Sequence, residues 1–460
     1  MLQQRVAQRL RASTTLSLAP RRHLWRCSTL ISSSPSSLLA RLEEQPAPAD
    51  GGVTLFALSK NTPQNLVQRI IAALPSPSSS SIGCLSEVLP PSALAHLAPA
   101  HDPANEAFSL AIARHEPSTP DERAVAFRST LTGRPNIALG REIRPELYDE
   151  GEDAGFEAFL RGESWGFGDR ANAANGGAEG IVQLQGVEPS HVKELVAFTA
   201  DRMQPFLAAL SSYPSAAKTG LVGSSTPFHS PTHAPFSLFY GPEPVSVGAV
   251  GVAIVGASPA PTVQLDYGGL EHVGVPYQVT SSQGNIVLTL SSQNAARLLL
   301  NAVNELFGTS AANLSAVQRS EEKEKEFYAA VFDHPPELPL DLSKARLVAR
   351  IMAGDPSRGA MSVETEEEIR EGYHLAFLHT RSPAPALVPP AQAQSLTFLS
   401  VAGSDAPVRQ AAADAPAESD VVELQAFVAA SENGVLLAPG VGGTVRVCGI
   451  EGASVTARAE

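Results

Sequence analysis

The stretch VTLFALSKNTPQNLVQRIIAALPSPSSSSIGCL, residues 53–85, decides the fold that we expect for this chain. Its first six residues are strand-like, and Thr62 followed by Pro63 is typical of the start of a helix. Apolar residues then recur at helical spacing up to Leu74, and residues 81–85 read as a second short strand after a loop of Pro and Ser. The stretch predicts a β-α-β unit, and such units build parallel sheets.

The same pattern returns further along the chain. We expect a long helix from Pro189 to Leu210, which Pro205 kinks or divides. The strands around it are expected at residues 181–184, 220–223, 236–239 and 245–255. Three more, at the edge of the sheet, are expected at residues 108–113, 124–127 and 137–139. The uncharged run 244–265 predicts a buried strand, because its apolar core has about half of the roughly 20 residues that a membrane-spanning helix needs.

Beyond residue 261 the pattern changes to hairpins around one helix. Residues 277–290 predict a hairpin, and Ser292 caps a helix that ends at Gly308. Later strands are expected at residues 346–352, 361–363, 373–378, 396–401, 424–429, 435–437, 445–448 and 455–457. Asn433-Gly434 is the strongest hairpin turn in the chain.

We therefore predict two domains of α/β and α+β class, with mixed sheets and helices packed on them. Residues 43–260 hold the β-α-β repeats and an acidic, glycine-rich insertion at 141–180. Residues 261–460 form the hairpin-rich domain, with Pro- and Ala-rich linkers at 383–393 and 405–420.

Composition excludes several classes of protein. The net charge of −14 argues against nucleic-acid binding, which needs a basic face. Three widely separated cysteines make neither a disulfide framework nor a metal site. No nucleophile elbow, Walker loop, zinc-protease motif or dinucleotide-binding motif occurs, so we expect no cofactor, no metal and no catalytic residue.

The first 42 residues differ from the rest of the chain. They hold seven arginines, no acidic residue and many Ser and Thr, which is typical of a mitochondrial presequence. We expect removal within residues 27–34 and a matrix location. The alternative is a disordered basic leader without an address.

Candidate ligand-binding residues lie at strand ends and on one strand. Gly83 and Cys84 lie near the end of the second strand of the first β-α-β unit, where open α/β sheets bind ligands, although a buried cysteine is commoner than a reactive one. Gly223, Ser224, Ser225 and Thr226 end the matching strand and could hold a carboxylate or cap a turn. Arg346 and Arg350 share a strand face and could clamp an anion or keep an edge soluble.

Three segments together resemble the FIST family, intracellular sensory proteins with an N-terminal and a C-terminal FIST region. They are GLVGSST at 220–226 with the strands after it, VPYQVTSSQGNIVLTL at 275–290 with the helix after it, and RLVARIMAGDPSRGAM at 346–361 followed by EGYHLAF. The chain departs from the family pattern at residues 85–88 (LSEV) and 429–434 (AASENG), and no ligand role is carried over there.

The resemblance implies a sensory protein that binds small, amino-acid-like molecules without catalysis. The first alternative is an interaction adaptor related to the F-box FIST proteins of ubiquitin ligases, with a protein partner docked on residues 141–180 and on the linker region 383–420. The second is a thiol or serine hydrolase, for which Cys84 is the main support. No transmembrane segment is expected.

Overall fold

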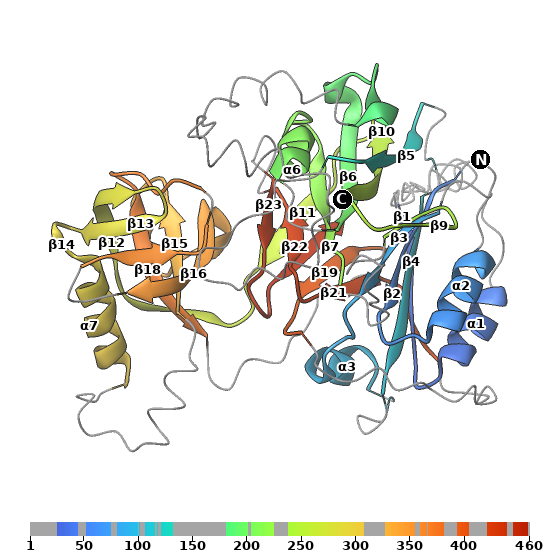
Figure 1. Cartoon of the computed structure of the whole chain (residues 1–460), viewed down its shortest axis with the longest axis horizontal. Helices are drawn as coiled ribbons and strands as arrows, with labels where there is room; N and C mark the ends of the chain where they lie inside the picture. The colour runs from blue at the N-terminus through green and yellow to red at the C-terminus, as the bar shows by residue number, and fades with distance from the viewer. Residues whose placement is uncertain are drawn as a thin grey trace, which may run out of the picture.

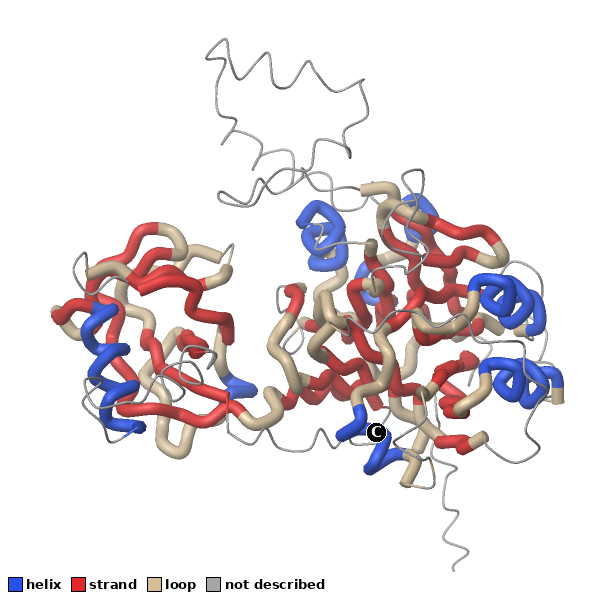
Figure 2. Tube along the Cα trace, turned by 60° about the horizontal axis from the view of Figure 1, so that its bottom comes forward, coloured by secondary structure: helices blue, strands red, loops and turns tan. Residues whose placement is uncertain are grey.

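The computed structural model describes residues 25–44, 52–74, 81–99, 101, 106–115, 117, 121–131, 181–200, 204–224, 238–307, 327–354, 359–365, 367–380, 393–403, 421–438 and 445–458. Figure 1 shows a larger body of three sheets and, beside it, a smaller barrel with one helix. The tube view in Figure 2 shows strands at the centre of both parts and helices at their periphery. None of the helices among the described residues is long and apolar enough to cross a membrane.

The first sheet has seven strands in the order β20-β1-β4-β2-β3-β8-β9. Their bounds are β1 Trp25–Ser32, β2 Thr54–Ser59, β3 Ser81–Ser86, β4 Phe108–His115, β8 Leu238–Tyr240, β9 Glu243–Val245 and β20 Val422–Leu424. Strands β2 and β3 pair in parallel through the helix α2 (Gln64–Ala73), as the opening stretch predicts. Helices α1 (Pro35–Glu43) and α2 bury their apolar side chains against one face of this sheet.

The second sheet repeats this arrangement, in the order β5-β10-β6-β7-β22-β23. Its strands are β5 Arg123–Ser129, β6 Val192–Thr199, β7 Ala217–Val222, β10 Ala249–Val255, β22 Val435–Leu437 and β23 Arg446–Cys448. Strands β6 and β7 are parallel and joined by α6 (Gln204–Ser211), and β10 lies antiparallel beside β6 just as β4 lies beside β2. Helix α6 and the short helices η3 (Val182–Leu184) and η4 (Pro189–His191) complete this part.

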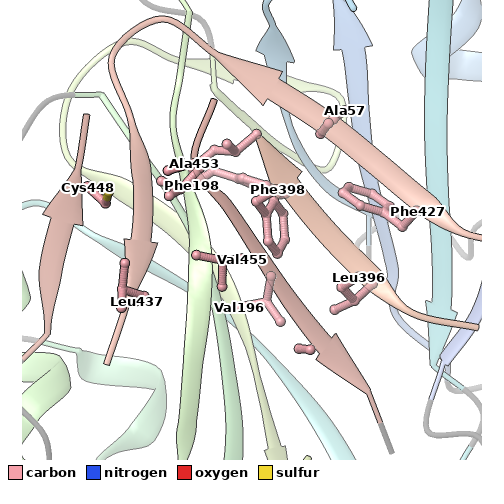
Figure 3. Close-up of a cluster of buried hydrophobic side chains, with 14 of the residues drawn as sticks. Ala57, Val196, Phe198, Leu396, Phe398, Phe427, Leu437, Cys448, Ala453 and Val455 are labelled. Atoms are coloured by element: carbon pink, nitrogen blue, oxygen red, sulfur yellow. The ribbon is translucent and has the colours of Figure 1, made fainter. Parts of the chain in front are cut away.

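A third sheet closes the larger body. Its order is β11-β24-β19-β21, with β11 Thr262–Asp266, β19 Leu396–Ser400, β21 Phe427–Ser431 and β24 Ser454–Arg458, and α3 (Pro91–Leu97) packs beside it. Residues from all three sheets meet in one buried apolar cluster, and Figure 3 shows Phe198, Phe398 and Phe427 at its centre. The ring centroids of Phe198 and Phe398 lie 6.5 Å apart, and those of Phe398 and Phe427 lie 5.6 Å apart.

The barrel is formed by six antiparallel strands, because β12 pairs with β18 on one side and with β13 on the other. Its strands are β12 Leu270–Gln283, β13 Ile286–Leu290, β15 Phe327–Phe332, β16 Leu347–Gly354, β17 Met361–Val363 and β18 His374–Thr380. The short β14 (Gln293–Asn294) leads into α7 (Ala295–Phe307), and η6 (Leu342–Lys344) precedes β16. Residues from all six strands and from α7 form one apolar cluster.

The predicted fold class is wrong. Strands hold 47% of the described residues and helices 19%, so the chain is predominantly β, with several sheets and a closed barrel. The largest error is the helix expected from Pro189 to Leu210, where the structure has strand β6 and then the short α6. Strand β6 is buried on both faces, so its apolar residues do not alternate with polar ones, and such a run is easily mistaken for a buried helix.

Smaller expectations also fail. Residues 182–184 form a 3-10 helix instead of a strand, and β4 lies inside the first sheet, between β1 and β2, instead of at its edge. Asn433-Gly434 joins β21 and β22, which do not pair with each other: β21 pairs with β19, whereas β22 pairs with β7 and β23. The strand expected at 137–139, the insertion 141–180 and the linker 405–420 lie outside the described residues, as does all of the linker 383–393 except its last residue.

Residues 25–42 belong to the leader that the sequence predicts, yet they form β1 and all but the last residue of α1. Strand β1 pairs with β4 along its whole length, from Trp25 opposite His115 to Ser32 opposite Phe108, and also pairs with β20. A cut within residues 27–34 would take part or all of this inner strand out of the sheet.

We predict that a chain beginning at Trp25 keeps the cooperative thermal unfolding of the full chain, whereas a chain beginning at Pro35 loses it. The second truncation removes β1, so the buried apolar side chains that pack against this strand become exposed to water. Circular dichroism during heating measures both. A cooperative transition in the chain that begins at Pro35 would contradict the role of β1.

Candidate functional site

Four strands end close together at one edge of the larger body. Strands β2 and β3 run in parallel, so their carboxyl ends lie at the same edge, each followed by a charged residue, Lys60 after β2 and Glu87 after β3. The backbone N–H of Ser224, after β7, donates to the carbonyl of Leu85 at 3.1 Å. The N–H of Glu87 donates to the carbonyl of Ala430 on β21 at 2.7 Å. These backbone contacts bring residues from both sheets and from the C-terminal part of the chain into one place.

The side chains at this edge form a charged group that we name the strand-end cluster: Lys60, Glu87, Ser224 and Glu432. The Lys60 Nζ lies 2.6 Å from Glu87 Oε2 and 3.6 Å from Glu432 Oε1. The Ser224 hydroxyl donates to Glu432 Oε2 at 2.6 Å. Glu87 is 1% exposed, whereas the side chains of Lys60 and Glu432 are each 14% exposed. Solvent therefore reaches Lys60 and Glu432, while Glu87 lies beneath them.

The loop that carries Glu432 is fixed by its neighbours. The Asn433 side-chain amide donates to the carbonyl of Gly223 at 3.0 Å, and its backbone N–H donates to the Ser431 hydroxyl at 3.0 Å. The Ser431 hydroxyl in turn donates to the carbonyl of Val222. These bonds hold Glu432 over the end of β7, where Ser224 can reach it.

The chemistry of the cluster follows from its charges. Two carboxylates share one ammonium, so the four side chains carry one formal negative charge. A mostly buried charge is tolerated only when it is paired and hydrogen-bonded. Glu432 is the carboxylate farther from Lys60, and it is also the more exposed one. The cluster is therefore suited to accept a second cationic group at Glu432.

Of the sequence-predicted residues, Ser224 is in the cluster, and the carbonyl of Gly223 supports it by accepting from Asn433. Ser225 and Thr226 lie outside the described residues. Cys84 lies in the apolar core between the sheets, where burial raises the pKa of its thiol well above the usual range. That shift disfavours the thiolate that a nucleophile needs.

Gly83 has a packing role in the structure. A Cβ at this position would lie 2.4 Å from the Phe56 ring on the neighbouring strand. The missing side chain thus leaves room for an aromatic ring that is completely buried.

Arg346 and Arg350 lie on the barrel, apart from the strand ends. Arg346 precedes β16 and contacts two carboxylates, Asp333 at 3.4 Å and Glu367 at 3.3 Å. Its guanidinium also lies 5.5 Å from the centroid of the Tyr373 ring. Arg350 is exposed on β16. The structure does not bring these two arginines together with Ser224.

Sequence reasoning missed Lys60, Glu87 and Glu432. Glu87 and Glu432 lie in the two segments where the chain departs from the FIST pattern, and that departure was the available signal. Lys60 follows a buried strand and belongs to none of the motifs described above.

Other chemistry at this edge finds little support. Searching the described part of the chain finds no group of three or more His, Cys, Asp or Glu that could hold a metal ion. Cys27, Cys84 and Cys448 are free and buried.

A scan against models of known protein families finds no match to this chain, and a search of curated proteins finds no significant match.

We predict that Lys60→Met lowers the free energy of unfolding by about 3–5 kcal/mol, because it leaves the buried Glu87 carboxylate without its nearest cation. Urea unfolding measures the change, and Lys60→Met combined with Glu87→Gln should recover part of it. Arg41→Met is the control, since its pairs with Glu44 and Glu423 are exposed and should contribute about 0–1 kcal/mol. Equal losses in the two single variants would contradict the buried pairing.

Proposed function

We propose that this chain is a small-ligand-binding sensory protein of the FIST type and that its ligand binds at the strand-end cluster. The observation that carries the proposal is the bond from Ser224, in the FIST-like segment 220–226, to Glu432 beside Lys60. Ligands of open α/β sheets bind outside the carboxyl ends of the strands. Strands β2, β3 and β7 present their carboxyl ends at this edge.

An amino-acid-like ligand fits the charges of the cluster. Its ammonium group would be accepted by Glu432, in place of the long contact to Lys60 at 3.6 Å. Its carboxylate would then pair with Lys60, which has three donors. Both side chains are partly exposed, so a ligand can reach them from solvent.

Binding without catalysis is the form of this function that the contacts favour. A thiol hydrolase needs a reactive Cys84, yet this thiol is buried and its pKa is raised by desolvation. The Ser224 hydroxyl donates to a carboxylate, and no imidazole contact activates it among the contacts of the described residues.

A mitochondrial matrix location is part of the proposal. It rests on the arginine-rich, acid-free composition of the first 42 residues. Because β1 begins at Trp25, a leader that is removed has to end before this residue for the first sheet to stay intact.

An interaction adaptor is the second candidate function. The observation that favours it is that the barrel exposes several large apolar side chains, among them Val275, Ile286, Leu288 and Met352. The adaptor hypothesis names residues 141–180 and 383–420 as docking segments. The first lies outside the described residues, and only residues 393–403 of the second are described.

A thermal-shift screen with amino acids and related amines tests the sensory proposal. A ligand at a hundred times its Kd stabilises the folded state by about 2.7 kcal/mol, which raises Tm by several degrees. We predict that Glu432→Gln abolishes this shift, because the amide carries no charge to pair with an ammonium group.

The matched control is Glu305→Gln on α7, which should leave the shift unchanged because the barrel helix lies away from the strand ends. A ligand whose shift survives Glu432→Gln would place the site elsewhere. A complete screen without stabilisation, together with a stable complex that Met352→Glu disrupts, would favour the adaptor.

A further inference from the structure

A second group of buried polar side chains lies at the opposite end of the core between the first two sheets. We name it the seam: Trp25, His115, Glu122, Glu194 and Ser258. Trp25 begins β1 and faces His115 at the end of β4, both in the first sheet. Glu194 is on β6 and Glu122 directly precedes β5, both in the second sheet. Strand β10 places β5 and β6 on either side of Ile254, so the two glutamates approach each other.

Two contacts join the sheets across the seam. The Trp25 indole N–H donates to Glu194 Oε2 at 2.7 Å, and His115 Nε2 lies 2.8 Å from Glu122 Oε1. The rings of Trp25 and His115 are 5.5 Å apart and meet edge to face. Glu122 Oε2 also accepts from the Ser258 hydroxyl at 2.7 Å. Both oxygens of Glu122 are therefore engaged.

Glu194 is less well satisfied than Glu122. It is 1% exposed, and its Oε1 has no hydrogen-bond partner among the described residues. The titratable groups that face it are the Cys27 thiol from β1 and Glu122, with His115 beyond Glu122. Lys218 on the neighbouring β7 pairs with Leu195, so it lies on the other face of the sheet. An ionised Glu194 would be a second buried negative charge with a single hydrogen bond.

We propose that Glu122 and Glu194 form a proton-binding pair that holds the two sheets together when Glu194 is protonated and weakens the seam when Glu194 ionises. This function is independent of the strand-end cluster. Burial raises the pKa of the Glu194 carboxyl to about 7, the bond from Trp25 opposes that rise, and the charge of Glu122 adds to it. The seam thus changes its charge near neutral pH.

The direction of the effect on stability follows from linkage. In the unfolded chain the Glu194 carboxyl loses its proton near the ordinary glutamate pKa of 4.5, whereas in the folded protein it keeps the proton up to about pH 7. Glu194 binds more protons in the folded state in this window, so its contribution to stability falls as pH rises from about 4.5 to 7 and levels off above it. Each pH unit in the window changes the unfolding constant by up to about tenfold.

Fluorescence of Trp25 gives a local measurement of the seam. The chain has two tryptophans, Trp25 and Trp165, so Trp165→Phe leaves Trp25 as the sole indole. In the full chain with this change, Trp25 emission is titrated from about pH 5 to 9, a range that brackets the pKa of Glu194. We predict a transition of one proton with its midpoint near pH 7, because the indole N–H bonds to the titrating carboxyl.

Variants of Glu122 and Glu194 distinguish a pair that binds a proton from a contact that only holds the two sheets together. Glu194→Gln keeps an acceptor for Trp25 and should abolish the transition and raise the unfolding midpoint at about pH 8, where the parent carboxyl is ionised. Glu122→Gln should move the transition to lower pH, because it removes the neighbouring charge. The matched control is Glu243→Gln on β9, an exposed site that should change neither quantity.

Three results would overturn the proposal: a flat titration of Trp25, a transition that persists in Glu194→Gln, or a midpoint that does not move in Glu122→Gln. The titration of the chain that carries only Trp165→Phe tests the first of these results, even if a variant of Glu122 or Glu194 does not fold. Failure of the ligand screen would leave this titration unaffected, so the two proposals fail separately.

Discussion

The structure depends on one apolar layer, in which side chains from three sheets are removed from water together. Phe398 of the third sheet meets Phe198 of the second sheet and Phe427 of its own, and Ala57 of the first sheet belongs to the same cluster (Figure 3). Completely burying a side chain of this size contributes roughly 1.5–3 kcal/mol relative to exposure. Since these residues come from both halves of the chain, none of the three sheets can bury its inner face alone.

This layer also explains where the charged groups lie. Strands buried on both faces have room for ionisable side chains only near their ends, and there each charge needs a partner. At one end of the layer Lys60 lies between Glu87 and Glu432, and at the other Trp25 and His115 bond to Glu194 and Glu122. Both groups bridge separate sheets. A change of charge at either end therefore acts on the packing of the sheets as well as on local contacts.

The second sheet shows which features of the fold cannot be predicted from the sequence. The β2-α2-β3 unit is predictable, because Thr62-Pro63 directly precedes its helix and the helix has one apolar face. In the matching unit β6-α6-β7, the sequence predicts one long helix over residues 189–210, where the structure has β6 and α6. The reason is that Val192, Leu195 and Phe198 are all buried, on one face of the sheet or the other, and show no strand period. Asn433-Gly434 has the chemistry of a hairpin turn, yet its flanking strands join different sheets. Turn chemistry is local, whereas strand pairing is decided by the whole core.

The sequence by itself determined the local elements: the first β-α-β unit, the hairpin of β12 and β13, the helix α7 after it, and Ser224 as a polar residue at a strand end. Only the tertiary structure decided that Ser224 meets Lys60, Glu87 and Glu432, and that Trp25 lies against Glu194. The physical reason is distance along the chain. Hydrophobic periodicity and caps depend on residues a few positions apart, while these contacts form only once the apolar layer has brought the ends of separate sheets together.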